Sequence, residues 1–215
     1  MYTIYCFWTE DNLMSDNRLA NLKQLREKSG CSVQLITPYN LPEYILPSEP
    51  IHAAYEYLSA THKADYLRTY FMNFYGGGYS DIKQTGGSWI SAFHELYDNE
   101  GEYWICGYKE TSAADIGYKP VAEFWNELIG NGAYICKPQT DLTKDWYQEM
   151  LDLLDKKLPQ LRKYPAKHPQ DASETGSGYP LGWNELLGRI FHRICYNYKN
   201  FILSMLPIPV MTNYR

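Results

Sequence analysis

The first 36 residues of this 215-residue chain restrict the fold more than any other segment. Residues 2–8 are β-branched and aromatic, as in a short strand, and residues 32–36 repeat an apolar strand pattern. Between them, Ser15 or Asp16 can cap a helix that ends at Gly30. A strand, a helix and a second strand in this order form a βαβ unit. We therefore expect an α/β fold with a mostly parallel central sheet flanked by helices.

The rest of the chain continues this alternation. We expect helices over about 53–75 with a break, 124–129, 141–158 and 185–203, and strands over 79–82, 103–108 and 133–136. Pro159 should close the third of these helices. Residues 111–120 and the polar stretch 163–180 read as surface loops, the second of them mobile, and residues 207–215 as an irregular tail. No internal repeat or second core is visible, which predicts one domain over 1–215, either complete or excised from a longer multidomain protein.

Composition excludes several classes of protein. The formal charge is -5 and there is no long Lys/Arg run, so we expect no nucleic-acid partner. No run of about eighteen apolar residues is present, so we expect no membrane span. The five cysteines are scattered without zinc spacing, which favours buried thiols in a reducing, cytoplasmic compartment, or in a host cytoplasm for a viral protein. We also expect a monomer. The 21 tyrosines suit sugar or base stacking and ordinary half-buried surface equally well.

The segment from His62 to Lys83 carries the chemistry. Asp65 and Arg68 are three residues apart in its helix, so both side chains lie on one face. They can form a simple surface ion pair, worth about 0.3–0.5 kcal/mol, or a functional pair. Three glycines, residues 76–78, follow the helix and exceed what a helix cap needs. The extra glycines indicate close approach of another strand or of a ligand.

A short strand after the glycines places three polar side chains on one side. Tyr79, Asp81 and Lys83 alternate with Ser80 and Ile82, which point to the other side. Ligands usually bind at the carboxyl ends of strands in an α/β sheet. A carboxylate there can hold a divalent cation that bridges the oxygens of a diphosphate.

These motifs together resemble a known group of enzymes. The sequence His-Lys-Ala-Asp-Tyr-Leu-Arg at residues 62–68, followed by Tyr-Gly-Gly-Gly-Tyr-Ser-Asp at residues 75–81, is similar to the DXD region of family-32-like sugar transferases. That group includes capsular-polysaccharide enzymes, yeast-type mannosyltransferases and glucosylating toxins. Residues 4–8, Ile-Tyr-Cys-Phe-Trp, also resemble its first strand. In its small size the chain also resembles a domain that chlorella-virus capsid-glycan enzymes carry. The resemblance covers about twenty residues closely, and it implies a GT-A (Rossmann-like) fold.

The resemblance also implies roles for individual residues. Asp65 and Arg68 would grip the donor sugar and its phosphate, and Asn131, which precedes a predicted strand, would lie near the anomeric carbon. Asn131 is as readily a turn residue in Gly-Asn-Gly. Asp81 would bind Mn²⁺ or Mg²⁺. The remaining predicted donor contacts are Phe7, Trp8 and Thr9 around the base, together with Tyr79, Ser80 and Lys83.

One departure from the pattern affects the metal. The second aspartate of the DXD motif is Lys83 here. Asp81 alone can hold the ion with water and phosphate oxygens, Lys83 can itself contact a phosphate, or the site can be inactive.

Several other residues are weaker candidates. His192, on the expected outer side of the last helix, and His168 could add a metal or phosphate ligand, although surface histidines are the simpler reading. Other candidates are Trp183 and Tyr179 for sugar stacking, and Glu110, Asp115 and Asp171 on the acceptor side.

The function expected from the resemblance is metal-dependent transfer of a hexosyl or deoxyhexosyl group from a UDP-sugar to a glycan or glycoprotein hydroxyl, with retention at the anomeric carbon. An inverting enzyme needs a carboxylate base, and the sequence points to none. The alternatives are a catalytically inactive nucleotide-sugar or glycan-binding domain, and an unrelated α/β protein with a chance motif.

Overall fold

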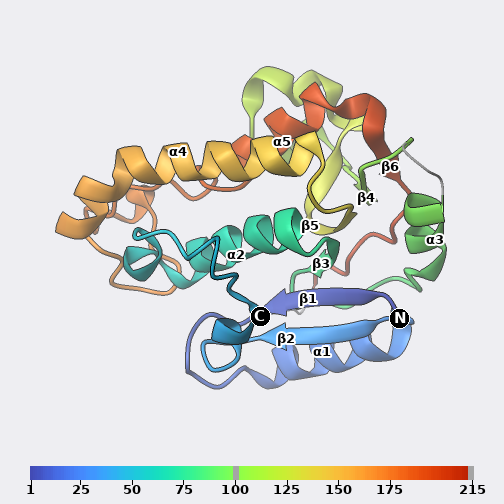
Figure 1. Cartoon of the computed structure of the whole chain (residues 1–215), viewed down its shortest axis with the longest axis horizontal. Coiled ribbons are helices and arrows are strands. Elements are labelled where there is room, and N and C mark those ends of the chain that lie inside the picture. The colour runs from blue at the N-terminus through green and yellow to red at the C-terminus, as the bar shows by residue number, and fades with distance from the viewer. Residues whose placement is uncertain (99–101, 213–215) are drawn as a thin grey trace.

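A computed structural model describes residues 1–98 and 102–212, in which a six-stranded sheet lies between two layers of helices (Figure 1). The strand order is β2-β1-β3-β5-β4-β6. β5 runs antiparallel to both of its neighbours, and the other three strand pairs are parallel. The strands are β1 (Thr3–Phe7), β2 (Ser32–Ile36), β3 (Gly77–Ser80), β4 (Ile105–Lys109), β5 (Ile129–Cys136) and β6 (Ile202–Ser204).

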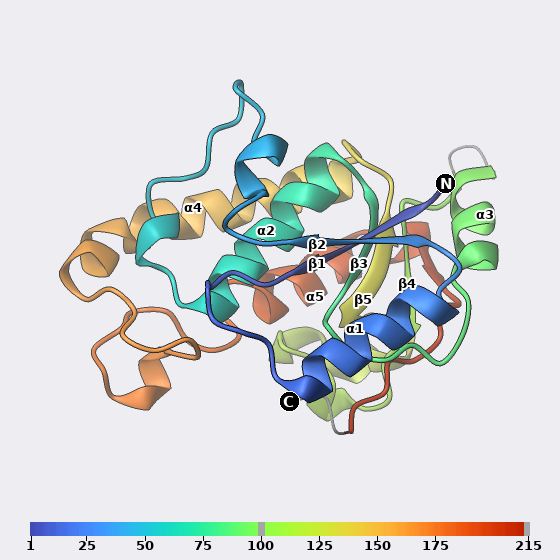
Figure 2. The ribbon, with the colours of Figure 1, turned by 90° about the horizontal axis from the view of Figure 1, so that it is seen from below.

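Helices cover both faces of this sheet. Their bounds are α1 (Asp16–Lys28), α2 (Ala60–Phe74), α3 (Ile90–Asp98), α4 (Asp141–Lys163) and α5 (Gly188–Asn197). On one face α4 packs against both α2 and α5, and α1 and α3 lie on the other face (Figure 1). Figure 2 shows the twist of the sheet, with β1 and β2 running across the direction of β5. Sequence analysis predicted α1 and β2 within a residue or two, and gave no expectation for α3.

Alternation along the strands builds a core on each face. On the side of α2, the rings of Phe7, Tyr79 and Tyr134 pack with Phe71 and Trp146. On the side of α1 and α3, the strands contribute other residues, and the core is formed by Ile4, Cys6, Ala133 and Ile135 with Leu25, Phe93 and Leu96. Successive side chains of a strand point to opposite faces, so β1 supplies both cores.

The glycine run between α2 and β3 is part of the sheet as well as a helix end. The strand expected at 79–82 begins earlier, at Gly77, which has a φ of +78°. A Cβ at Gly77 would stand 2.9 Å from the carbonyl oxygen of Thr3 in β1. The expectation that the extra glycines permit close approach is therefore confirmed, and the approaching group is a neighbouring strand.

Two helix predictions end at the wrong residue. α4 continues through Pro159 to Lys163, because the final turns are anchored by Leu161, whose side chain is fully buried. The helix expected over 185–203 is shorter, since α5 covers Gly188–Asn197 and the chain then pairs as β6 with β4. The apolar residues after α5 therefore complete the sheet edge instead of extending a helix.

The region around β5 also differs from expectation. Residues Lys119–Glu127 form 3₁₀ turns where a short helix was expected over 124–129. β5 begins at Ile129, four residues before the predicted start at Ala133. Residues 207–212 are irregular as predicted, and the rest of the predicted tail, 213–215, lies outside the described residues.

Within the described part of the chain, no helix has the length and apolar character needed to cross a lipid bilayer. The five cysteines are free thiols, and all except the half-buried Cys31 are buried.

Candidate active site

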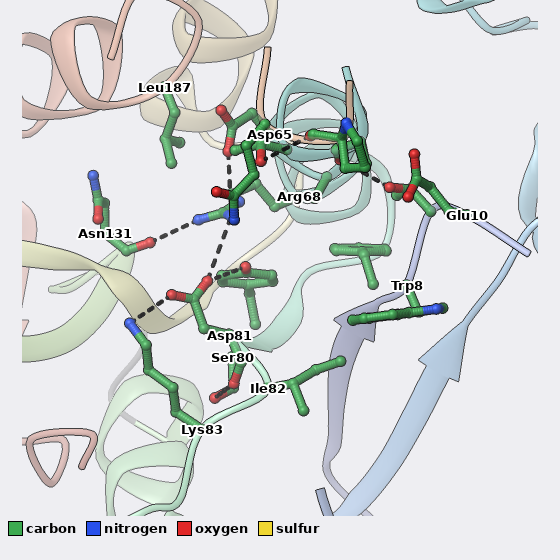
Figure 3. Close-up of a pocket in the computed structure, with 18 of the residues that line it drawn as sticks. Trp8, Glu10, Asp65, Arg68, Ser80, Asp81, Ile82, Lys83, Asn131 and Leu187 are labelled. Carbon is green, nitrogen blue, oxygen red and sulfur yellow. Dashed lines mark hydrogen bonds and ion pairs between the residues drawn. The ribbon is translucent and has the colours of Figure 1, made fainter. Parts of the chain in front are cut away.

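A cavity of about 490 Å³ opens where β1 and β3 end, a size common for small-ligand sites. The carboxyl ends of these strands contribute the residues that follow them, and α2 contributes one wall (Figure 3). The structure brings together in this cavity all ten residues predicted for the site, whose individual roles stay predictions: Phe7, Trp8, Thr9, Asp65, Arg68, Tyr79, Ser80, Asp81, Lys83 and Asn131.

Arg68 is the centre of the polar contacts. Its Nη2 lies 3.2 Å from Oδ1 of Asp65 and 3.4 Å from Oδ1 of Asp81, and its Nη1 donates to the carbonyl oxygen of Asn131 at 3.0 Å. The side chain is buried, with the residue 7 % exposed, so these contacts compensate part of the loss of water around the guanidinium, while its Nε has no hydrogen-bond partner among the described residues. Asp65 and Arg68 therefore do form an ion pair along the helix, but the pair is buried and shared with Asp81 instead of lying at the surface.

The pKa values of the two carboxyl groups beside Arg68 are shifted in opposite directions. Asp65 is 3 % exposed, and desolvation raises its pKa although Arg68 acts to lower it. Desolvation also acts to raise the pKa of Asp81, but the neighbouring Lys83 and Arg68 outweigh it and the pKa of Asp81 is lowered. The carboxylate of Asp81 is thus the more firmly ionised of the two.

The expected alternation after the glycines places three side chains in contact. The Tyr79 hydroxyl donates to Oδ1 of Asp81 at 2.5 Å, and Nζ of Lys83 donates to Oδ2 at 2.9 Å. The Asp81 backbone N–H still donates to the carbonyl of Gly132 in β5, at 2.8 Å, which fixes its position at the end of the sheet. Ser80 lines the cavity, and its hydroxyl donates to the Asp81 carbonyl at 2.7 Å.

Aromatic rings pack against the guanidinium of Arg68. The Arg68 guanidinium carbon lies 4.2 Å from the centre of the Tyr79 ring, which itself stacks on Phe7 at 5.7 Å. The half-buried indole of Trp8 stands at the β1 side of the cavity (Figure 3), and its Nε1 donates to the carbonyl of Asn12 at 2.8 Å. Thr9 is tied to the start of α2 by a hydrogen bond to the carbonyl of Ala60 at 2.8 Å.

Asn131 lies inside β5, not in a turn before it. The flanking glycines have a packing role, because a Cβ at Gly130 would stand 2.0 Å from Cζ of Tyr108. The Asn131 carbonyl faces Arg68, and its side chain lies towards α5, with Nδ2 3.5 Å from the position a Cβ would take at Gly188. The prediction of Asn131 as a turn residue is therefore wrong, and its place in the cavity agrees with the site prediction.

The surroundings of Asp81 fit a divalent metal ion poorly. Both carboxylate oxygens already accept from Tyr79 or Lys83, and Arg68 stands close by. Among the described residues, no group of three or more His, Cys, Asp or Glu side chains could hold a metal ion. An ion bound to Asp81 would also stand close to the Lys83 ammonium, and this repulsion would offset part of the attraction of the carboxylate. The expected Mn²⁺ or Mg²⁺ stays a prediction that these contacts do not favour.

Of the weaker candidates, Trp183 alone lines the cavity, where it is 41 % exposed. Tyr179 is buried and its hydroxyl contacts Nδ1 of His62 at 2.9 Å, so it belongs to the core. His192 is also buried, not on an outer face; its Nδ1 accepts from the Gly117 N–H at 2.8 Å.

The acceptor-side candidates all lie away from the cavity lining. The Nε2 of His192 lies 3.5 Å from Oε1 of Glu110, so both belong to a separate buried pair. Asp115 accepts from two neighbouring hydroxyls, and Asp171 is buried and holds its own loop together. His168 is exposed and, like the others, is not among the lining residues.

Part of the cavity wall is formed by residues that the sequence pattern does not indicate. Arg18, in the first turn of α1, reaches the carbonyl oxygen of Ile82 with its Nη1 at 3.2 Å. Other missed lining residues are Glu10, Asn12, Thr61, Asn184, Leu187 and Gly188. These positions come from the segment after β1, from α1 and α2, and from the segment that leads into α5, and nothing in their local sequence pattern marks them as neighbours.

Comparison with known proteins supports the fold. The structure is similar to that of the PaToxG glycosyltransferase, with a TM-score of 0.53 and 12% sequence identity over 92% of this chain and 69% of that chain. A weaker match, to the apo form of mouse xyloside xylosyltransferase 1, has a TM-score of 0.45 and 11% identity over 95% of this chain and 84% of that chain. No family model and no curated protein sequence matches. The first likeness shows a shared fold, and the expected α/β architecture with a mostly parallel sheet flanked by helices is confirmed.

Proposed function

We propose that this protein is a glycosyltransferase that moves a hexosyl or deoxyhexosyl group from a UDP-sugar to a hydroxyl of a glycan or glycoprotein. The observation that carries the proposal is the cavity at the ends of β1 and β3, which gathers Asp65, Arg68, Asp81 and Lys83 in a fold shared with a glycosyltransferase. We also propose that the protein belongs to the DXD-region sugar transferases. It would act as a monomer in the cytoplasm.

The contacts suggest how the residues divide the work. Phe7, Trp8 and Thr9 offer stacking and polar contacts for the uracil at the β1 end of the cavity. Arg68 and Lys83 bring positive charge to the place where the diphosphate leaves. Stabilising the charge that develops on a leaving group is commonly the largest single contribution to catalysis.

The sugar lies between these groups and the wall formed by Asn131 and α5. Asp65 and Asn131 are placed to accept from or donate to sugar hydroxyls. In the proposed retaining transfer, the bond from the anomeric carbon to the phosphate oxygen breaks and a bond to the acceptor oxygen forms on the same face. The acceptor hydroxyl then gives its proton to the departing diphosphate.

Release of UDP from a panel of UDP-sugars tests this proposal. A glycosyltransferase hydrolyses its donor slowly when no acceptor is present, so we expect UDP release by the wild type and a loss of about tenfold or more in Asp65→Asn. The matched control is Asp155→Asn, an exposed carboxylate on α4 outside the cavity. Binding of a UDP-sugar with no release, with or without added glycans, would favour the inactive binding domain. The absence of both binding and release with every donor would contradict the proposed function.

A further inference from the structure

We propose that the ammonium group of Lys83 holds the diphosphate of the donor in place of a divalent metal ion. This proposal rests on the proposed function and goes beyond it, because it makes donor binding independent of Mn²⁺ and Mg²⁺. Lysine is a well-established point-charge ligand for phosphate.

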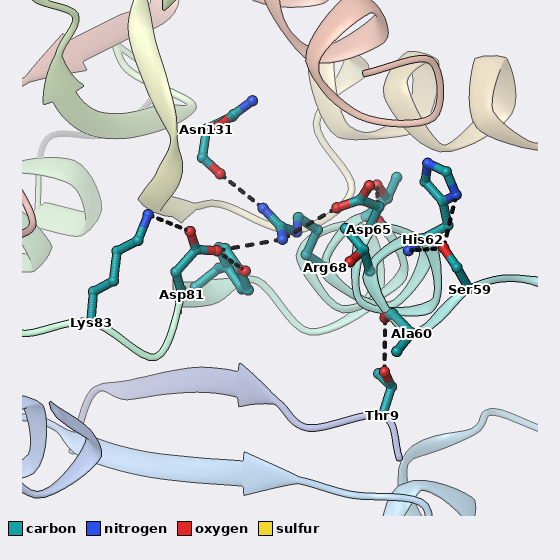
Figure 4. A network of polar contacts seen from close by, with 12 residues as sticks. Thr9, Ser59, Ala60, His62, Asp65, Arg68, Asp81, Lys83 and Asn131 are labelled. Atoms are coloured by element: carbon teal, nitrogen blue, oxygen red, sulfur yellow. Dashed lines mark hydrogen bonds and ion pairs between the residues drawn. The ribbon is translucent and has the colours of Figure 1, made fainter. Parts of the chain in front are cut away.

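The ion pairs of the cavity form a line of alternating charge (Figure 4). Asp65 contacts Arg68 at 3.2 Å, Arg68 contacts Asp81 at 3.4 Å, and Asp81 contacts Lys83 at 2.9 Å. Arg68 stands between two carboxylates, and Lys83 contacts the second of them, which Arg68 already shares. Because Lys83 also lines the cavity, its ammonium stands beside the place proposed for the diphosphate.

The position of this ammonium is set by the sheet. Asp81 and Lys83 leave β3 with their side chains on the same side, and the Asp81 N–H is held by the Gly132 carbonyl of β5. The Lys83 side chain is 11 % exposed, so its charge acts in a partly desolvated place where electrostatic attraction is stronger than in water.

Gly132, a buried residue of β5, packs close to the ammonium. A Cβ at this residue would stand 3.8 Å from Nζ of Lys83, 3.4 Å from Oδ2 of Asp81 and 3.3 Å from the hydroxyl of Tyr108. A longer side chain at this residue would crowd the Asp81–Lys83 pair and displace the ammonium. Phosphate oxygens accept strongly from ammonium groups.

Two arginines can share the charge of the diphosphate with Lys83. Arg68 lies on the α2 side of Asp81, and Arg18 lies on the α1 side, 3.2 Å from the carbonyl of Ile82. All three cationic side chains line the same cavity. The cavity lining therefore already holds three cationic side chains beside the carboxylates of Glu10, Asp65 and Asp81, so positive charge for a diphosphate is present without a metal ion.

Isothermal titration of UDP into the wild type, Lys83→Asp, Lys83→Met and Lys83→Arg tests this assignment, with each titration run in EDTA and again in Mn²⁺. The wild-type affinity should change by less than about threefold between the two conditions. Lys83→Met should bind about tenfold or more weakly in both, and Lys83→Arg should retain most of the affinity. Lys83→Asp creates the two-carboxylate motif, so its affinity should fall in EDTA and return in Mn²⁺.

The wild type alone decides the main question, even where a variant fails to fold. Wild-type binding that is about tenfold or more tighter in Mn²⁺ than in EDTA would overturn the inference and leave the proposed function intact. Unchanged metal-independent affinity in a folded Lys83→Met would overturn it as well. If the wild type fails to bind UDP both in EDTA and in Mn²⁺, both proposals are overturned.

Discussion

Replacing Arg68 by methionine, which keeps a long apolar stem and removes the guanidinium, should destabilise the fold strongly. The change leaves the buried carboxyl group of Asp65 without its partner and removes the donor to the Asn131 carbonyl. Breaking a buried ion pair in this way typically lowers the free energy of unfolding by about 3–5 kcal/mol. For a chain of this size, that corresponds to a fall of roughly 6–20 °C in the melting temperature.

A second substitution shows whether the unpaired carboxylate is the cause. Asp65→Asn in the Arg68→Met background should recover roughly 2 kcal/mol of the lost stability, because the amide carries no charge that needs compensation. Urea denaturation of the wild type and both variants measures these differences. The control is Arg193→Met, since Arg193 pairs with Glu149 in a half-exposed position and should cost less than about 1 kcal/mol.

The pH dependence gives an independent check. Burial already raises the pKa of Asp65 in the wild type, and the loss of Arg68 should raise it further. A raised folded-state pKa means that ionisation costs stability, so the deficit of Arg68→Met should grow as the pH rises above about 4 and shrink below it. A deficit below about 1 kcal/mol at neutral pH, or no recovery in the double variant, would refute this reasoning.

Other substitutions test separate parts of the fold. Asp171 accepts from the Lys167 N–H and from the hydroxyls of Thr175 and Ser177, and these hydrogen bonds hold its pKa at about 2 against the opposing effect of burial. Asp171→Asn should cost about 2 kcal/mol at neutral pH in urea denaturation, and the difference should vanish as the pH falls from about 4 towards 2; a constant difference would contradict this. Gly77→Ala should lower the melting temperature well beyond Gly176→Ala, because both glycines have positive φ but only Gly77 stands against a strand; equal effects would show that strain alone matters. Pro159→Ala should stabilise α4 by about 1–2 kcal/mol in thermal unfolding, and a loss of stability would show that the proline is accommodated without cost.

Local patterns were sufficient to predict which polar side chains of residues 62–83 lie together. The spacing of Asp65 and Arg68 on one helical turn, and the alternation of Tyr79, Asp81 and Lys83, each follow from the geometry of a single element. The structure brings these groups together because α2 and β3 are joined by the short glycine run at 76–78. A segment of about twenty residues can therefore be read without knowledge of distant contacts.

The features that the sequence did not predict depend on contacts between distant segments. β6 forms because Ile202 and Leu203 pair with β4. In the sequence alone, the same residues also fit the pattern of a continuing helix. Gly-Asn-Gly at 130–132 looks like a turn until Tyr108 from β4 is placed over Gly130. His192 was expected on an outer face, and only the tertiary position of the Gly117 segment shows that it is buried.

Saturation-transfer nuclear magnetic resonance of UDP-glucose and other UDP-sugars with the wild type and Asp65→Asn tests the central claim most directly. The proposed site holds both ends of the donor, so saturation should reach uracil and sugar protons of at least one donor, and the sugar signals should weaken in Asp65→Asn. No saturation with any UDP-sugar, or equal sugar signals in both proteins, would contradict the assignment of this cavity as a donor site.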